Sequence, residues 1–270
     1  MKKAVLVFLL IVLAVLVLLP FLWTFSTSLK PLTEVNRHPP EWISPNMSLK
    51  PYGDMFFYLP FSTYALNSLI VASSATILTL LVGSLAAFAF ARFRFAGKRL
   101  FLLLFLLSQM LPGASVIIPL FQLMRESGLY DTHVGLILVH TAVLLPFVIW
   151  LLYGFFLGIP GEVEDAALID GCSRLSALRR VILPLALPGI GATALFAFLG
   201  SWSEFFFALI LTSSDATRTI PVGIGLFVGE YVDVWNQMSA AAVLFSLPPL
   251  ALFMLMRRTF VQGLAAGALQ

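Results

Sequence analysis

The stretch Glu164-Asp165-Ala166-Ala167-Leu168-Ile169-Asp170-Gly171 is polar and lies between long apolar segments, and Val181-Ile182-Leu183-Pro184 follows it ten residues later. Acidic residues near its start suit the positive end of a helix dipole, Pro160 can occupy the first turn, and Gly171 can take the left-handed conformation that ends a helix. The stretch therefore predicts a short polar helix in a loop between apolar segments. If the helix continued, Arg174 would lie one turn after Asp170.

The composition indicates a membrane protein. Hydrophobic residues make up 60% of the 270 residues, charged residues make up 11%, and the mean hydropathy is +1.00. A soluble domain of this size would lack the polar surface that it needs. We therefore expect an all-α integral membrane protein, with residues 1–270 forming a single transmembrane domain.

Charge and cysteine usage exclude several other classes. The net charge of +3 is carried by basic residues at the ends of apolar segments, which favours a role in membrane orientation over nucleic-acid binding. The single Cys172 excludes an intramolecular disulfide, and the three histidines are scattered rather than spaced as metal ligands. The sequence predicts no metal site.

Long apolar segments predict six membrane spans with a polar, proline-rich external segment after the first. The spans are expected at about residues 4–25, 62–90, 100–123, 134–157, 185–211 and 239–256. Prolines inside them predict bends that suit a translocation path, although prolines in membrane helices also serve packing alone; they are Pro112, Pro119, Pro146, Pro184, Pro188, Pro248 and Pro249.

The distribution of basic residues predicts that both termini are cytoplasmic. Of the 16 Lys and Arg residues, the inner side would then hold Lys2, Lys3, Arg92, Arg94, Lys98, Arg99, Arg174, Arg179, Arg180, Arg257 and Arg258. The outer side would hold Lys30, Arg37, Lys50, Arg125 and Arg218. This orientation places the polar loop of residues 158–180 in the cytoplasm.

Polar side chains within the spans are candidates for a substrate path. Glu204 is the strongest, because a carboxylate in a span is costly unless it faces a cavity or a partner. Asn67 and Gln109 are weaker candidates of the same kind, and Trp202 could stack on a sugar ring. The alternatives are packing hydrogen bonds for the polar groups and an interface anchor for the tryptophan.

The chain contains no catalytic machinery of its own. It has neither a G-x-x-x-x-G-K-[ST] loop nor a nucleophile with a paired base. Three hypotheses remain. The chain could be a subunit of an importer, a secondary transporter or channel for a small polar solute, or an intramembrane enzyme. An ion-coupled carrier usually needs carboxylates in its spans to bind the coupling ion, and this sequence offers only Glu204. An enzyme would need a catalytic cluster, which the sequence lacks.

The polar loop resembles the signature of ABC importer permeases, which runs Glu-Ala-Ala, three residues, Gly, nine residues, Ile, one residue, Leu-Pro. Asp165 takes the glutamate position and Val181 the isoleucine position, while Ala166, Ala167, Gly171, Leu183 and Pro184 match. Further similarity to the carbohydrate-uptake branch, of the maltose-permease G subunit class, comes from Thr27-Ser28-Leu29-Lys30-Pro31, Asn67-Ser68-Leu69, Trp202-Ser203-Glu204 and Phe260-Val261-Gln262-Gly263-Leu264.

This resemblance implies a sugar or polyol permease in a prokaryotic inner membrane. Its partners would be a second homologous permease, two ATPase subunits that bind ATP and magnesium, and an extracytoplasmic solute-binding protein. The loop would dock on the ATPase as a coupling helix between spans 4 and 5, through Glu164, Asp165, Ala166, Ala167, Asp170, Gly171 and Arg174. The external loop of about residues 212–237 would reach into the binding protein, where Gly223, Gly225 and Gly229 would let the backbone enter a narrow cleft.

Overall fold

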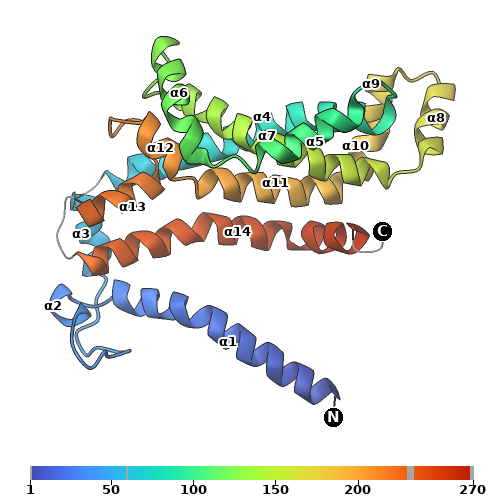
Figure 1. The fold of residues 1–270 in the computed structure, drawn as a ribbon. Helices are drawn as coiled ribbons and strands as arrows, with labels where there is room; N and C mark the ends of the chain where they lie inside the picture. The colour runs from blue at the N-terminus through green and yellow to red at the C-terminus, as the bar shows by residue number, and fades with distance from the viewer. Residues whose placement is uncertain (1, 59, 230–233, 268–270) are drawn as a thin grey trace. The chain divides into compact units, whose positions relative to one another are not determined.

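The computed structural model describes residues 2–58, 60–229 and 234–267, and every regular element in these ranges is a helix (Figure 1). The chain divides into two compact units. One comprises Met1–Ala65 with Thr219–Pro248, and the other comprises Leu66–Arg218 with Pro249–Gln270. We describe each unit by itself.

Among the described residues, four helices are long and apolar enough to cross a membrane. They are α1 (Lys2–Ser28), α4 (Phe61–Arg92), α7 (His133–Leu157) and α14 (Trp235–Gly267), with the apolar part of α14 ending at Met256. Side chains of α1 are exposed along its apolar stretch, as expected for a helix surrounded by lipid. Two bent helix pairs bring the number of possible spans to six within the described ranges.

The predicted third span is broken rather than continuous. Helix α5 (Lys98–Ser108) and helix α6 (Gly113–Glu126) meet at an angle of 97°. Pro112, which precedes α6, has an extended backbone (ψ 126°) and no N–H to donate, so the helix cannot run through it. The bend expected at Pro112 is therefore present, whereas Pro146 lies inside the unbroken α7.

The predicted fifth span is also divided. Residues Arg174–Leu185 and helix α11 (Leu187–Trp202) meet at 81°, and Pro188 lies in the first turn of α11. Helix α12 (Phe206–Leu211) begins after a short break. The expected span over residues 185–211 is covered by α11 and α12 rather than by one continuous helix, because Pro188 opens α11 and Glu204 supplies a new helix start.

The core of the larger unit joins the long helices to the polar loop. Helix α7 packs against α11 (Figure 1), and side chains of α4, α7 and α11 share a hydrophobic cluster. Leu178 and Ile182 belong to this cluster and lie in η1 (Leu178–Ile182), a π-helical turn that follows α8 (Gly161–Ile169) and α9 (Arg174–Ala177). A short helix, α10 (Leu183–Leu185), leads from η1 to α11. The end of the polar loop is thus embedded in the core.

The smaller unit contains the segment after α1 that was predicted to be external. Residues 26–60 include α2 (Leu32–Val35) and α3 (Lys50–Tyr58). The buried Glu34 carboxylate accepts hydrogen bonds from Ser44 and from Asn46, the latter at 2.7 Å, and these bonds hold the pKa of Glu34 below its ordinary value. Asn236 donates to the carbonyl of Lys30 over 3.1 Å. Residues 26–60 therefore form a folded structure rather than an extended chain.

The centre of the expected external loop is a helix, α13 (Ile220–Gly229). Gly223 is buried in this helix, and a Cβ atom there would lie 2.3 Å from Cδ2 of the Tyr64 ring. That Gly223 lets the backbone enter a narrow cleft stays a prediction, and in the structure the glycine allows close packing on Tyr64. Gly225 lies in the same helix and Gly229 is its last residue, while residues 230–233 lie outside the described residues.

Gly223→Ala should lower the thermal stability of the protein. Alanine favours a helix over glycine by about 1 kcal/mol, but overpacking a filled core costs about 1–3 kcal/mol, so the clash with Tyr64 should prevail. Gly53→Ala is the matched control, since a Cβ there meets no heavy atom within 4 Å. Thermal unfolding of the purified chain in detergent measures both, and equal midpoints for the two variants would contradict the packing argument.

Candidate functional site: the braced polar loop and the broken helices

Helix α8 carries the predicted signature and ends as expected. Gly171 has a φ of +85°, its N–H donates to the carbonyl of Leu168 over 3.1 Å, and the N–H of Cys172 donates to the carbonyl of Ala167 over 3.0 Å. These two bonds form a Schellman motif, which satisfies the last carbonyls of the helix and requires the left-handed residue. The prediction of a left-handed stop at Gly171 is confirmed.

Glu164 is buried and ties the loop to the end of α4. Its Oε2 lies 3.0 Å from Nε of Arg92, and both side chains are at most 12% exposed. Arg92 also donates through Nη2 to the carbonyl of Ile159 over 2.8 Å, just before α8. One arginine therefore binds both the start and the first turn of the loop helix.

Arg174 does not stand one turn after Asp170, because the helix stops between them. Ser173 caps the next helix, α9, and the guanidinium of Arg174 lies 4.9 Å from the centre of the Phe93 ring. Its Nη1 is 4.0 Å from Oε1 of Glu164. Arg174 is half exposed, so its contact with Glu164 stabilises the loop less than the buried contact between Arg92 and Glu164 does.

The outer face of the loop is open. Of the predicted coupling residues, Asp165, Ala166, Asp170 and Gly171 are exposed, whereas Ala167 is buried with Glu164. Two large apolar side chains next to them are also exposed, Ile169 at 86% and Leu175 at 65%. One side of the loop is thus bound to the rest of the protein through Glu164, and the other side is exposed and carries both carboxylates and apolar groups.

Glu204 lies at the break between α11 and α12, where its carboxylate starts the second helix. It accepts hydrogen bonds from the N–H groups of Phe207 and Ala208, at 2.8 and 3.0 Å. Its Oε2 lies 3.3 Å from Nε2 of His140 on α7, and the other ring nitrogen of His140 is 2.7 Å from Oγ of Ser201. Glu204 therefore fixes the position of α12 relative to α7.

The sequence candidates Trp202 and Asn67 are packed inside the protein. Trp202 is 3% exposed and stacks on Phe198 with 5.6 Å between ring centres. Asn67 donates to the carbonyls of Ala216 and Arg218, both at 2.9 Å, and its Oδ1 is bound to His133. These contacts leave neither side chain facing an open path in this conformation.

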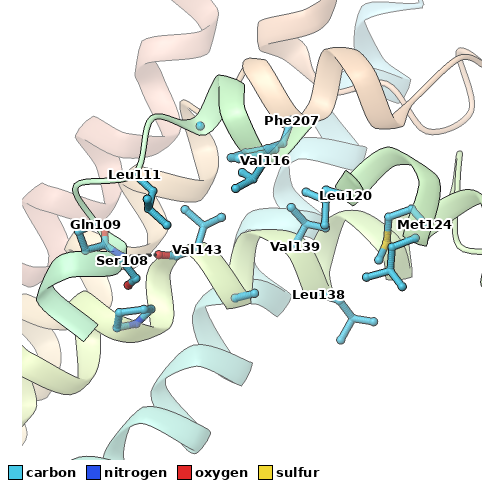
Figure 2. Close-up of a pocket in the computed structure, with 14 residues that line it drawn as sticks. Ser108, Gln109, Leu111, Val116, Leu120, Met124, Leu138, Val139, Val143 and Phe207 are labelled. Atoms are coloured by element: carbon cyan, nitrogen blue, oxygen red, sulfur yellow. Dashed lines mark hydrogen bonds between the residues drawn. The ribbon is translucent and has the colours of Figure 1, made fainter. Parts of the chain in front are cut away.

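Gln109, by contrast, is exposed at a cavity of about 530 Å³ beside the break between α5 and α6. Its Nε2 donates to the carbonyl of Val143 over 3.1 Å. Figure 2 shows Ser108 and Gln109 at one end of the cavity and Met124 at the other, with Phe207 on the wall. The lining is otherwise largely apolar, so polar groups are concentrated where the helix is broken.

Asp131 organises the segment that follows α12. This residue has a φ of 57°, which aspartate tolerates, and its N–H donates to the carbonyl of Leu211 over 2.9 Å. Its carboxylate accepts from the N–H groups of Ser213 and Ser214, at 2.9 and 3.2 Å, and from the hydroxyl of Thr217. Burial raises the pKa of Asp131, but these hydrogen bonds outweigh burial and hold the pKa below its ordinary value.

Asp131→Ala should release the segment after α12. A hydrogen bond to a charged group contributes about 1.5–3 kcal/mol, so the amides of Ser213 and Ser214 should exchange with solvent deuterium about 10–100-fold faster. Asp215→Asn is the control, because the carboxylate that it loses is exposed and pairs with Arg218 at the surface. Unchanged deuterium exchange in Asp131→Ala would show that the hydrogen bonds to the Asp131 carboxylate do not order this segment.

Sequence reasoning missed Arg92, His140 and Asp131 as organising residues. An ionisable residue within a span is a signal in itself, so His140 could have been selected together with Glu204. Arg92 and Asp131 lie at span ends, where charged residues are common, and their partners are far away in the chain. Only the fold brings these pairs together.

Comparison with known proteins agrees with the geometry. A family model described as "Binding-protein-dependent transport system inner membrane component" matches residues 79–266. The diacetylchitobiose uptake system permease protein of Streptomyces coelicolor is 35% identical, over 96% of this chain and 94% of the relative. The trehalose/maltose transport system permease protein of Thermococcus litoralis is 33% identical, over 100% and 98%.

Two further similarities extend this comparison. The sulfoquinovosyl glycerol transport system permease protein of Agrobacterium fabrum is 38% identical, over 94% of this chain and 89% of the relative. A chain in the crystal structure of a bacterial ABC transporter that imports alginate superimposes with a TM-score of 0.79 at 22% identity, over 96% of both chains. At that identity the structural match establishes the fold alone.

Proposed function

Because this chain belongs to the family of binding-protein-dependent transport system inner membrane components, we propose that it forms half of the translocation path of an ATP-driven ABC importer for a sugar or a related polyol. The observation that carries this proposal is the two-sided construction of the polar loop. Its outer face is open for a partner, and its inner face is tied to α4 and the core. A loop built in this way can transmit movement of a bound partner to the membrane helices.

The outer face is the proposed docking surface for an ATPase subunit. Asp165, Asp170 and the apolar Ile169 and Leu175 are exposed and close together in sequence. An apolar centre with polar groups around it is the usual composition of a protein interface. ATP and magnesium would be bound by the ATPase, and this chain would supply no catalytic group.

The inner face is the proposed lever. Movement of α8 would reach α4 through Arg92 and Glu164, and would reach α11 through the embedded turn η1. Packed helices move as rigid bodies in such transitions, because a filled core does not deform continuously. Closure of the ATPase would thereby rock the spans between inward-facing and outward-facing states.

The proposed assembly contains a second homologous permease, two ATPase subunits and an extracytoplasmic solute-binding protein. A second solved structure of the alginate transporter, at a TM-score of 0.70, is described as a complex with a periplasmic protein that holds an alginate pentasaccharide. The chain is a multi-pass component of the inner membrane, and we place both termini in the cytoplasm from the distribution of Lys and Arg.

The proposed substrate class follows the names of the relatives, which are described as transporting diacetylchitobiose, trehalose, maltose or sulfoquinovosyl glycerol. Within this chain, the cavity at the break between α5 and α6 is the preferred candidate for part of the path, with Gln109 as its polar contact. Its volume of about 530 Å³ lies within the range typical of small-molecule sites. Glu204, Trp202 and Asn67 would act by holding the surrounding helices in place.

The external loop of about residues 212–237 remains a proposed contact for the binding protein, in a revised form. Its first part is ordered by Asp131 and Asn67, and its centre is the packed helix α13. Each of these two parts would therefore present a preformed surface to the binding protein. The alternative function, a secondary transporter or channel for a small polar solute, would need neither this surface nor the open face of α8.

Gly171→Val tests the coupling proposal. A β-branched residue in the left-handed conformation is strained by about 1–2 kcal/mol, while the space around the Cβ position is empty, so the change acts on the backbone of the loop. Ligand-stimulated ATPase activity and uptake by the reconstituted complex should fall at least severalfold, with membrane insertion and assembly retained.

Gly161→Val is the matched control for this experiment. Gly161 lies at the start of the same helix, its Cβ position is equally open, and its φ is not in the left-handed region. Wild-type coupling in both variants would contradict the proposed role of the loop. Failure of the purified chain to retain any ATPase subunit would instead favour the secondary transporter.

A further inference from the structure

A second cavity, of about 540 Å³, lies where α5 begins beside α7, and we call it the basic cavity. Three of its eight lining residues are cationic, and none carries a carboxylate; the cations are Arg94, Lys98 and Arg99. Tyr153 of α7 forms part of the wall, and the ammonium group of Lys98 lies 5.5 Å from the centre of its ring. The cavity is separate from the one at the break between α5 and α6.

The charges of the basic cavity are not neutralised within the described part of the chain. No carboxylate there lies within 4.0 Å of a charged nitrogen of Arg94, Lys98 or Arg99, whereas nearby Arg92 and Arg174 both approach Glu164. The start of α5 adds to this potential, because Gly97 at its N-cap has no side chain to bond the first N–H groups and the first turn contains no acidic residue. The cavity therefore favours an anion.

The surroundings of the basic cavity identify the kind of anion. Helix α5 has no buried residue, and the turns that follow its cationic start carry exposed leucines and phenylalanine, among them Leu100, Phe101, Leu103, Leu104 and Leu107. A cationic start next to an exposed apolar surface matches a lipid, whose headgroup is charged and whose chains are apolar. A free phosphate would gain nothing from that apolar surface.

We propose that the basic cavity binds the headgroup phosphate of an anionic phospholipid, with the acyl chains lying along the exposed face of α5. Arg92, at the end of α4 next to the cavity, contacts Ile159 and Glu164 of the polar loop. The bound lipid would therefore lie in the leaflet on the same side as that loop, the side we propose to be cytoplasmic. This site is distinct from the translocation path.

The test compares lipid binding by two variants that lose the same charge. In Arg94→Gln with Arg99→Gln, two cavity cations are removed while Lys98 keeps its contact with Tyr153. In Arg179→Gln with Arg180→Gln, two exposed cations that do not line the cavity are removed. Phosphatidylglycerol bound to the purified full-length chain in neutral detergent is counted by native mass spectrometry over a titration.

One phosphatidylglycerol should bind the wild type and the Arg179/Arg180 variant tightly, and the Arg94/Arg99 variant about 30-fold more weakly, since each basic residue near a membrane contributes about 1 kcal/mol. Arg94→Lys with Arg99→Lys should restore binding. Phosphatidylcholine with the same chains should not occupy the site, and millimolar inorganic phosphate should not displace the lipid. Equal weakening in both glutamine variants, or displacement by inorganic phosphate, would overturn the proposal.

Discussion

Glu164→Gln is expected to abolish most ATP-driven uptake, reducing it at least tenfold. The change keeps the shape of the side chain but leaves the guanidinium of Arg92, which is 12% exposed, without its carboxylate. Breaking one side of a buried ion pair costs about 3–5 kcal/mol, which is enough to detach α8 from the end of α4. Uptake and ligand-stimulated ATPase activity in proteoliposomes measure the result.

Two variants show whether the loss of uptake comes from breaking the ion pair between Arg92 and Glu164. Arg174→Ala removes the contact with Glu164 at 4.0 Å and the contact with the Phe93 ring, but its side chain is half exposed, so uptake should stay within about twofold of wild type. Arg92→Gln combined with Glu164→Gln should cost less than the sum of the two single changes, because the double variant leaves no buried charge unpaired. Additive losses would show that the two residues act separately.

Glu204→Ala is expected to destabilise the larger unit before it affects any substrate contact. The variant removes the acceptor of two N–H groups at the start of α12 and leaves Nε2 of His140 without its carboxylate. Losing a helix cap and leaving one buried polar group unsatisfied together cost about 2–4 kcal/mol. The thermal unfolding midpoint of the purified chain should fall clearly, and uptake should fall with it.

Ser203→Ala is the control for Glu204, because Ser203 is exposed and its hydroxyl donates to the carbonyl of Leu199 in the preceding turn. Glu204→Gln retains an oxygen acceptor for α12 and should be intermediate in stability. If Glu204→Gln lost uptake while its unfolding midpoint stayed at the wild-type value, Glu204 would contact the substrate directly rather than position α12.

Features that depend on neighbours in sequence were predictable. Gly171 was expected to end α8 because few other residues tolerate a positive φ, and Pro112 was expected to bend its span because it cannot donate a backbone hydrogen bond. Long apolar runs likewise located the membrane helices to within a few residues. The size of the bends was not predictable, since it depends on what packs against each half.

Features that depend on distant residues were not predictable. Glycines in the external loop were expected to let the backbone enter a narrow cleft, yet Gly223 packs closely on a tyrosine that is far away in the chain. Glu164 was assigned to the partner surface, but it is buried in an ion pair with Arg92. Glu204 was selected as a candidate without its neighbour His140. Each of these residues was selected from the sequence, whereas its contact in the structure is with a residue far away in the chain.

The proposed coupling of this permease to an ATPase partner through the braced loop is tested most directly by an uptake measurement. The measurement uses radiolabelled trehalose or diacetylchitobiose, the sugars named for two relatives, and proteoliposomes that hold the co-purified complex and its binding protein. We expect uptake to require ATP on the side of the polar loop and to survive ionophores that collapse all ion gradients. Uptake without ATP that stops when an ion gradient is collapsed would contradict the coupling.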